Sequence, residues 1–167
     1  NQSAPRIASD GAGGVIVAWQ EYVVAWDIYA QRIDADGNIL WSPGGEPICT
    51  ENSIQVDCQI IADGEGGAIL AWRDHRTGDV DVYAQLINGV GSTKWSPGGV
   101  LVCEVEGEQW SSQLTSDGAG GAIVTWRDLR SGDNDIYAQR LDSLGTPLWG
   151  PGGVALCIFE LDQTDPQ

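Results

Sequence analysis

The 167 residues of this chain contain three copies of one pattern, spaced by about 54 residues. The most regular positions hold a tyrosine, a tryptophan and a cysteine: Tyr29, Tyr83 and Tyr137; Trp41, Trp95 and Trp149; Cys49, Cys103 and Cys157. The copies span residues 1–53, 54–107 and 108–162, and residues 163–167 re-enter the first-strand pattern of a further copy. A repeat of this length is one supersecondary unit that cannot bury its apolar surface alone, so neighbouring copies must cover it.

Each copy predicts four short strands. The second strand is an almost continuous apolar run, which is typical of a strand buried on both faces. A glycine-rich turn, Asp10–Gly14 in the first copy, precedes it, because glycine accepts the positive φ angles of tight turns. The strands of the first copy are expected at Arg6–Ser9, Val15–Trp19, Asp27–Ile33 and around Trp41 to Ile48. The first three strands of the other copies are expected at Gln59–Ala62, Ala68–Trp72 and Asp81–Ile87, and at Gln113–Ser116, Ala122–Trp126 and Asp135–Leu141. No segment has the 3.6-residue period of an amphipathic helix, so the chain is predicted to be all-β.

Four antiparallel strands repeated at this interval are typical of propeller blades. The predicted fold is therefore three tandem four-stranded antiparallel blade-like repeats, open or closed by oligomerisation. Closed propellers have roughly 4 to 8 blades, so three are too few. Three explanations stay open: the chain is part of a longer repeat protein, two or three copies close one ring, or each copy passes its end to the next in a head-to-tail polymer.

Two stretches resemble those of known propeller families. Ser9–Trp19 and Ser116–Trp126 resemble a loosened sialidase Asp box, and Tyr29–Trp41 is similar to the tryptophan-docking repeat of quinoprotein propellers. The spacing of this stretch departs from that family, and in the second copy Asn88 stands where the docking repeat has Asp. The repeats as a whole resemble those of secreted bacterial β-propellers. This resemblance implies a fold and a secreted origin and does not imply a particular activity.

The charge of the chain limits its partners. Lys and Arg total 8, Asp and Glu total 24, and the net charge is −16. Nucleic acids and anionic membrane surfaces are excluded as partners, because both need cationic protein surfaces. No apolar run reaches the roughly 18 residues of a membrane span, so no membrane insertion is expected. Calcium, or a neutral or cationic partner, is compatible with the negative electrostatic potential of such an acidic chain.

The acidic residues gather in the loops between the second and third strands. Alternating carboxylates around a glycine can converge on one hard cation, and calcium takes roughly 6 to 8 oxygen ligands. The candidate calcium ligands are Asp74, Asp79 and Asp81 in the second copy and Asp128, Asp133 and Asp135 in the third. Under the alternative interpretation, Asp79 and Asp133 are turn residues, and Asp74 and Asp128 pair with Arg76 and Arg130. The first copy lacks this loop.

The aromatic residues offer a candidate ligand surface. Six of the eight tryptophans occupy repeat positions, where packing between blades accounts for them. Trp26 and Trp110 lie outside the pattern, and with Tyr22 they are the candidate contact residues, for example for the faces of sugar rings.

The four cysteines include one outside the repeat, Cys58, nine residues after Cys49. A Cys49–Cys58 disulfide would join the first blade to the second. Cys103 and Cys157 are then free and buried, or bridged to each other or between subunits. Four cysteines in an acidic, glycine-rich, all-β chain favour an oxidising setting, outside the cell or at its surface.

Motifs for catalysis are absent from the sequence. There is no G-x-S-x-G or H-E-x-x-H pattern, and His75 is the only histidine. We therefore predict a non-catalytic extracellular structural or interaction module with no organic cofactor. It is expected to form a homo-oligomer or polymer, as a filament or a ring. The alternatives are a carbohydrate-binding propeller with a glycan as its ligand, or a fragment of a larger propeller enzyme.

Overall fold

The computed structural model describes residues 1–157, and these contain twelve strands and no helix. The strands are β1 (Gln2–Ser9), β2 (Val15–Tyr22), β3 (Trp26–Ile33), β4 (Glu46–Cys49), β5 (Gln55–Ala62), β6 (Ala68–Asp74), β7 (Asp81–Ile87), β8 (Val100–Leu101), β9 (Gln109–Ser116), β10 (Ala122–Asp128), β11 (Asp135–Leu141) and β12 (Val154–Cys157). Within the described residues, no helix of the length and apolar character of a membrane span is found. The predicted further copy at residues 163–167 lies outside the described part of the chain.

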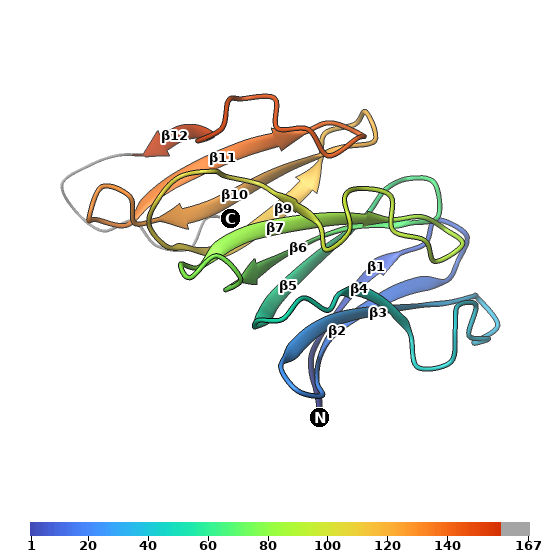
Figure 1. Cartoon of the computed structure of the whole chain (residues 1–167). Helices are drawn as coiled ribbons and strands as arrows, with labels where there is room; N and C mark the ends of the chain where they lie inside the picture. The colour runs from blue at the N-terminus through green and yellow to red at the C-terminus, as the bar shows by residue number, and fades with distance from the viewer. Residues whose placement is uncertain (158–167) are drawn as a thin grey trace.

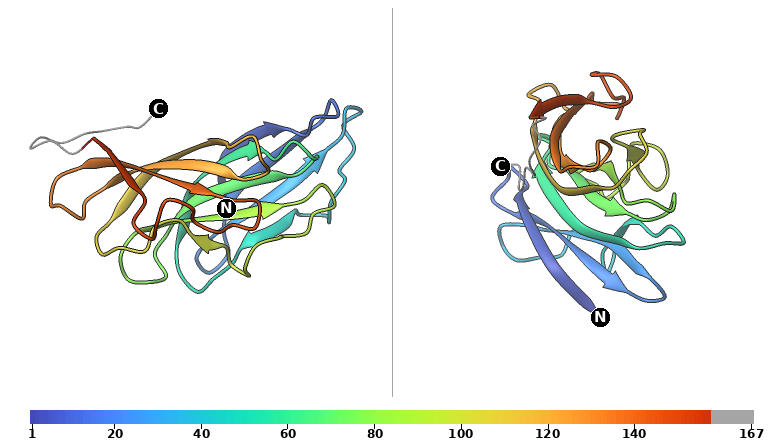
Figure 2. Two further views of the ribbon diagram at one scale, coloured as in Figure 1. Left: turned by 90° about the horizontal axis from the view of Figure 1, so that it is seen from above. Right: turned by 90° about the vertical axis from the view of Figure 1, so that its left-hand side faces the viewer.

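The strands form three four-stranded antiparallel sheets in which each strand pairs with its neighbour in the sequence. We call β1–β4 blade 1, β5–β8 blade 2 and β9–β12 blade 3. One blade lies within each sequence repeat, and blade 2 lies between the other two (Figure 1). Two further views show the sheets stacked as an open fan that does not close into a ring (Figure 2). The predicted fold class, tandem propeller-like blades, is confirmed.

The first strand of every blade contains a bulge that the sequence did not predict. The pairing register shifts between Ser3 and Arg6 in blade 1, and at the matching place in the other two blades. One non-glycine residue at this place has a positive φ angle in each blade: Ala4 (49°), Asp57 (57°) and Ser111 (52°). These first strands were predicted to start four residues later, because an inserted residue breaks the alternation of side chains on which the prediction depends.

The repeated tryptophan near the fourth strand lies outside that strand. Strand β4 begins at Glu46, and Trp41 precedes it in a loop. The side chain of Gln31 holds this loop, since its amide nitrogen donates to the Ser42 carbonyl at 2.8 Å and its oxygen accepts the Trp41 N–H at 3.0 Å. Gln85 makes the same two bonds in blade 2. The buried glutamine of each Y-A-Q stretch therefore positions the tryptophan.

The glycine-rich turn after each first strand is closed by its aspartate. Asp10 Oδ1 accepts the N–H groups of Ala12 (2.8 Å) and Gly14 (2.7 Å). The Ala12 bond is the largest single influence on Asp10, and with Arg32 it holds the pKa of this carboxyl below its usual range despite partial desolvation. Gly14 is required here, because a Cβ would lie 2.2 Å from the Ile33 carbonyl oxygen.

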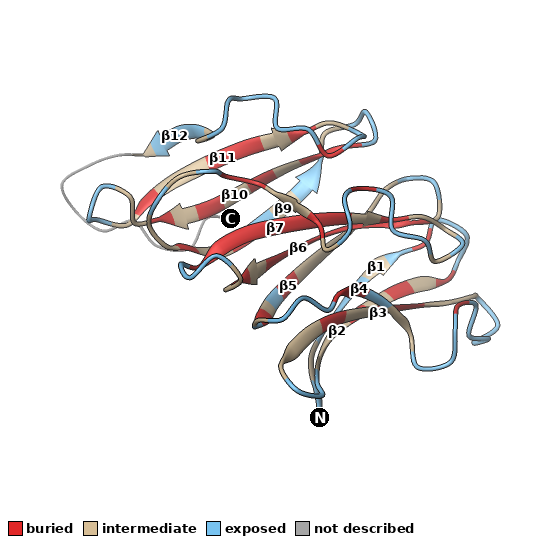
Figure 3. Cartoon of the chain, in the orientation of Figure 1, coloured by how far each residue is buried: buried red, intermediate tan, exposed pale blue. Residues whose placement is uncertain are grey.

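The hydrophobic cores lie between the blades. Strand residues alternate between two sheet faces, so each blade has a forward face toward the next blade and a rear face toward the previous one. The first core joins the forward face of blade 1 (Ile28, Trp41 and Ile48) to the rear face of blade 2 (Leu70 and Trp72). The second core repeats this arrangement between blades 2 and 3. Buried residues accordingly dominate β6 and β7 of the middle blade, whereas β12 is largely exposed (Figure 3).

Candidate functional site

Each internal junction between blades is closed by a tryptophan. Trp41 of blade 1 donates its Nε1–H to the Gly89 carbonyl of blade 2 at 3.2 Å and lies against Gly91. Trp95 of blade 2 donates in the same way to the Ser143 carbonyl of blade 3 at 3.1 Å and lies against Gly145. A Cβ at Gly145 would approach the Trp95 ring to 2.7 Å, so a larger residue there would push the ring away.

A second junction contact combines an arginine with a cysteine of the previous blade. Arg76 lies 4.0 Å over the Tyr83 ring, and its Nη2 donates to the Cys49 sulfur at 3.0 Å and to Asp74. Asp74 is fully buried and also accepts the Trp72 Nε1–H at 2.9 Å. Burial by itself raises the pKa of Asp74, but the bonds from Arg76 and Trp72 and the Arg76 charge outweigh burial and lower it.

The junction between blades 2 and 3 repeats this arrangement. Arg130 lies 3.8 Å over the Tyr137 ring and donates to Asp128 at 2.6 Å and to the Cys103 sulfur at 3.2 Å. Trp126 donates to the same aspartate at 2.7 Å. The aspartate and the ring fix each guanidinium within its own blade, and its bond to the cysteine sulfur ties that blade to the previous one.

The structure does not bring the six candidate calcium ligands together as metal sites. Asp74 and Asp128 pair with Arg76 and Arg130, as the alternative interpretation expected. Asp81 accepts the Thr77 hydroxyl and Asp135 accepts the Ser131 hydroxyl, while Asp79 and Asp133 lie exposed in the loops. Within residues 1–157, no group of three His, Cys, Asp or Glu side chains is placed to hold a metal ion.

Of the three candidate contact aromatics, the structure brings two together. Tyr22 and Trp26 meet edge to face at the tip of the β2–β3 hairpin with ring centroids 5.4 Å apart, and Tyr22 is about half exposed. Trp110 is elsewhere, at the junction of blades 2 and 3. It lies 4.3 Å beneath the guanidinium of Arg73, so it has a packing role there.

The predicted Cys49–Cys58 disulfide is not present, because all four cysteines are free thiols. Cys49 faces Arg76 across the junction, whereas Cys58 is enclosed in the core and donates to the Gln59 carbonyl. Burial raises the pKa of Cys49 to about 11 and that of Cys58 to about 12. Sequence spacing could not show that an arginine side chain occupies the position beside Cys49.

The forward face of blade 3 lacks the cover that blades 1 and 2 receive. Trp41 and Trp95 are each 7% exposed, whereas Trp149 at the same repeat position is 38% exposed. The residue before the repeated cysteine gives a sharper contrast, since Ile48 is 3% exposed, Val102 is 0% exposed and Leu156 is 59% exposed. Blade 3 therefore presents a complete forward face with no blade against it in residues 1–157.

The rear face of blade 1 is open in the same way. Gln2 is exposed, although its equivalents Gln55 and Gln109 are fully buried. Ile7 is 65% exposed, while its equivalents, Ile60 and Leu114, pack against the two cores. The sequence did not predict these surface residues, because their repeat positions are core positions in the other blades. Only the number of repeats, three, indicated that the end faces are uncovered.

The fold defines this chain as a β-propeller-like repeat protein. No protein-family model matches it, and no curated protein matches it. Among solved structures, it is similar to the endo-arabinase of Bacteroides thetaiotaomicron VPI-5482, with 18% sequence identity and a TM-score of 0.54. The match covers 92% of this chain and 61% of that chain, so the present chain spans about three fifths of the length of its neighbour. At this identity the likeness shows the fold alone.

Proposed function

We propose that the chain is a non-catalytic structural and interaction module that extends its stack of blades by binding a second copy head to tail. The forward face of blade 3 in one copy packs on the rear face of blade 1 in the next. The observation that carries this proposal is the exposure of Trp149 and Leu156 at positions that are buried wherever a following blade is present.

The two internal junctions supply the geometry of this contact. The Trp149 Nε1–H has its acceptor in the Ala35 carbonyl of the second copy, because Ala35 corresponds to Gly89 and Ser143. Gly37 corresponds to Gly91 and Gly145, and the space beside it is open where the tryptophan ring would lie. The acceptor and the free space for the ring are therefore already present at the first blade.

The new junction differs from the internal ones at the tip of the β2–β3 hairpin. Blade 1 has Val23 and Val24 near the position of Arg76, and both valines are well exposed. They would lie near Cys157 of the preceding copy and give an apolar contact in place of the arginine–cysteine contact. Fully burying one apolar side chain contributes roughly 1.5–3 kcal/mol, so a few such residues on each face offset much of the cost of association.

Two blocking variants test the proposal. Leu156→Glu places a charge on the forward face, and Ile7→Glu places one on the rear face. Each variant alone is expected to be monomeric by light scattering after size exclusion, whereas an equimolar mixture forms one-to-one dimers, because each partner keeps one intact face. The wild type is expected to gain mass with concentration. Val90→Glu, an exposed change away from both faces, serves as the control.

Two results would contradict self-assembly. The first is a wild type that stays monomeric at all concentrations, and the second is a mixture of the two blocked variants that forms no dimer. Negative-stain microscopy of the wild type separates a ring from a filament, since a head-to-tail contact gives a ring only when its rotation closes.

A second candidate function is glycan binding outside the cell or at its surface. It is favoured by the exposed Tyr22–Trp26 pair, because flat aromatic side chains provide stacking surfaces. The structural neighbour is named for action on a carbohydrate, which is consistent with this candidate. A glycan array with wild type and Tyr22→Ala tests it: signal lost in the variant supports the candidate, and no signal with wild type removes it.

A further inference from the structure

One repeat position on the third strand is occupied by Arg32, Leu86 and Arg140 in turn. Arg32 fills a site between blades 1 and 2. Its Nε and Nη2 donate to Asp10 Oδ2 at 3.1 and 3.0 Å, and its Nη1 donates to the Gly89 carbonyl of blade 2 at 2.9 Å. The guanidinium thus bridges the turn of one blade to a loop of the next.

Blade 3 uses the same pairing. Arg140 Nε and Nη2 donate to Asp117 Oδ2 at 3.0 and 2.9 Å. Two of the three blades therefore hold a guanidinium against the aspartate of the glycine-rich turn, with both bonds directed to the same oxygen. The guanidinium site therefore consists of one aspartate oxygen and, for Arg32, a backbone carbonyl of the following blade.

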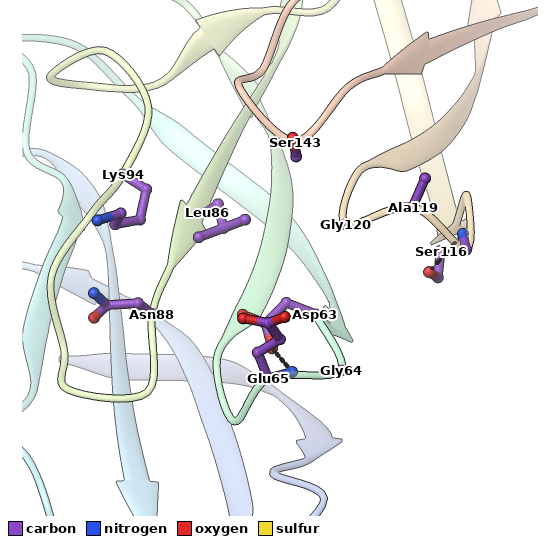
Figure 4. Close-up of a pocket in the computed structure, with 11 residues that line it drawn as sticks. Asp63, Gly64, Glu65, Leu86, Asn88, Lys94, Ser116, Ala119, Gly120 and Ser143 are labelled. Atoms are coloured by element: carbon purple, nitrogen blue, oxygen red, sulfur yellow. Dashed lines mark hydrogen bonds between the residues drawn. The ribbon is translucent and has the colours of Figure 1, made fainter.

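In blade 2 the carboxylate is present but its arginine is missing. Leu86 replaces it, and a pocket of about 850 Å³ opens between blades 2 and 3. Asp63, Glu65, Leu86, Asn88, Lys94 and Ser143 are among the residues that line it (Figure 4). Asp63 Oδ1 accepts the N–H groups of Glu65 and Gly67, as in the other turns. Within residues 1–157, no ion pair or hydrogen bond to Asp63 Oδ2 is found.

Lys94 does not replace the missing arginine. It stands where blades 1 and 3 have Leu40 and Leu148, and its backbone N–H bonds to the Leu86 carbonyl. In blade 2, therefore, the cation stands at the position of the leucine, and the leucine stands at the position of the arginine. In the view of Figure 4 the Lys94 side chain points away from Asp63. Within residues 1–157, no ion pair joins Lys94 to Asp63.

We propose that the pocket between blades 2 and 3 binds a guanidinium group from outside the chain, supplied by an arginine side chain of a peptide or partner protein. The ligand's guanidinium occupies the position that Arg32 takes at the preceding junction. It donates two N–H groups to Asp63 Oδ2 and one to the Ser143 carbonyl, which corresponds to Gly89. A planar group with five N–H donors satisfies both acceptors at once, which an ammonium does not. The net charge of −16 favours the approach of a cationic ligand.

The probe is Nα-acetyl-arginine amide, titrated into ¹⁵N-labelled Leu156→Glu protein. This variant is expected to be monomeric and keeps the pocket, so the result does not depend on self-assembly. We expect saturable shifts in the amide signals of Gly64, Glu65 and Gly67. Asp63→Asn is expected to weaken binding about tenfold, because charge-assisted hydrogen bonds to the carboxylate are lost. Asp36→Asn, in an exposed turn of blade 1, is the matched control and is expected to bind as before.

A second variant fills the site from within the chain. Leu86→Arg with Lys94→Leu restores the residues of blades 1 and 3, and it is expected to abolish probe binding and to raise the melting temperature. The acetyl-citrulline and acetyl-lysine amides, one neutral and one an ammonium, are expected to bind much more weakly. The inference is overturned if the arginine probe gives no saturable shifts, if citrulline or lysine amide binds equally well, or if the filled variant still binds.

Discussion

At the scale of single residues, the internal junctions depend on buried charge that is fully paired. Asp74 has no exposed surface, and five groups donate to it: the Arg76 guanidinium and backbone N–H, Trp72 Nε1, Gln55 Nε2 and the Cys49 thiol. A buried carboxylate without a partner destabilises the folded state, whereas a buried ion pair stabilises it little more than apolar side chains of similar volume would. These aspartates therefore fix how one blade lies on the next more than they add stability.

We predict that Arg76→Ala destabilises the protein by about 3 kcal/mol at neutral pH, because it leaves the Asp74 charge buried and unpaired. In the wild type the pKa of Asp74 is lowered, so its contribution is present above the unfolded value and is lost as pH falls through the folded one. In the variant, burial without Arg76 raises this pKa. The difference in stability between the two proteins is then expected to shrink as the pH falls from the raised pKa of the variant to the lowered pKa of the wild type.

Urea denaturation of both proteins at pH 7 and in the acid range measures this effect. Arg76→Lys is the control for charge, because it keeps a cation but loses the planar stacking on Tyr83. Its free energy of unfolding is expected to lie between those of the wild type and Arg76→Ala. A destabilisation that is the same at both pH values would contradict the role given to Asp74.

At the scale of elements, every first strand carries a bulge with one residue in the left-handed region. L-residues other than glycine pay about 1–2 kcal/mol for this conformation. Because Ala4, Asp57 and Ser111 all share it, the bulge is a property of the blade and not of one sequence. It bends the strand and lets its first half continue pairing after the inserted residue.

We predict that Ser111→Gly leaves the fold intact and stabilises it by up to about 1 kcal/mol, since glycine adopts positive φ without strain. Ser111→Val is expected to destabilise by about 1 kcal/mol or more, because a β-branched residue is poorly tolerated there. Denaturant midpoints of the two variants measure the effect. Val stabilising as much as Gly would mean that the bulge is absent in solution.

The sequence predicted elements by periodicity, and it failed where periodicity is broken. The second strands and the third strands of blades 2 and 3 start where they were expected, because their apolar runs and Tyr positions are regular. The first strands were predicted too short because the bulge at Ala4 interrupts alternation. The predicted Cys49–Cys58 disulfide was wrong, because the nine-residue spacing does not show that Arg76 of the next blade lies against Cys49. The Leu86 exchange is visible in the sequence, but its pocket needs the neighbouring blade.

At the scale of the whole molecule, stability comes from contacts between blades, and the two outer faces are the sites where it is incomplete. A stack of this kind behaves approximately as a row of units with nearest-neighbour terms. Adding a blade at an end completes a core without changing the interior. The forward face at Leu156 and the rear face at Ile7 are thus the two places in residues 1–157 where a further blade would complete a core.

Thiol accessibility offers a prediction at this scale. Burial raises the pKa of Cys49, Cys58 and Cys103 to about 11, 12 and 12, so these thiols are expected to react slowly at pH 8. Cys157, on the open forward face, is less buried. In the monomeric Leu156→Glu variant we expect one fast thiol in four with Ellman's reagent. In assembled wild type that thiol is expected to be protected, and four equally fast thiols would contradict the packing described.

In the proposed head-to-tail stack, every third junction would differ chemically from the others, because valines take the place of the junction arginine at the hairpin tip of blade 1. All junctions share an apolar core and a tryptophan, but only the internal ones add the contact between an arginine and a cysteine of the previous blade. Mild detergent should therefore separate the junctions between copies before the internal ones. An assembled stack treated with detergent would then release whole chains, each three blades long.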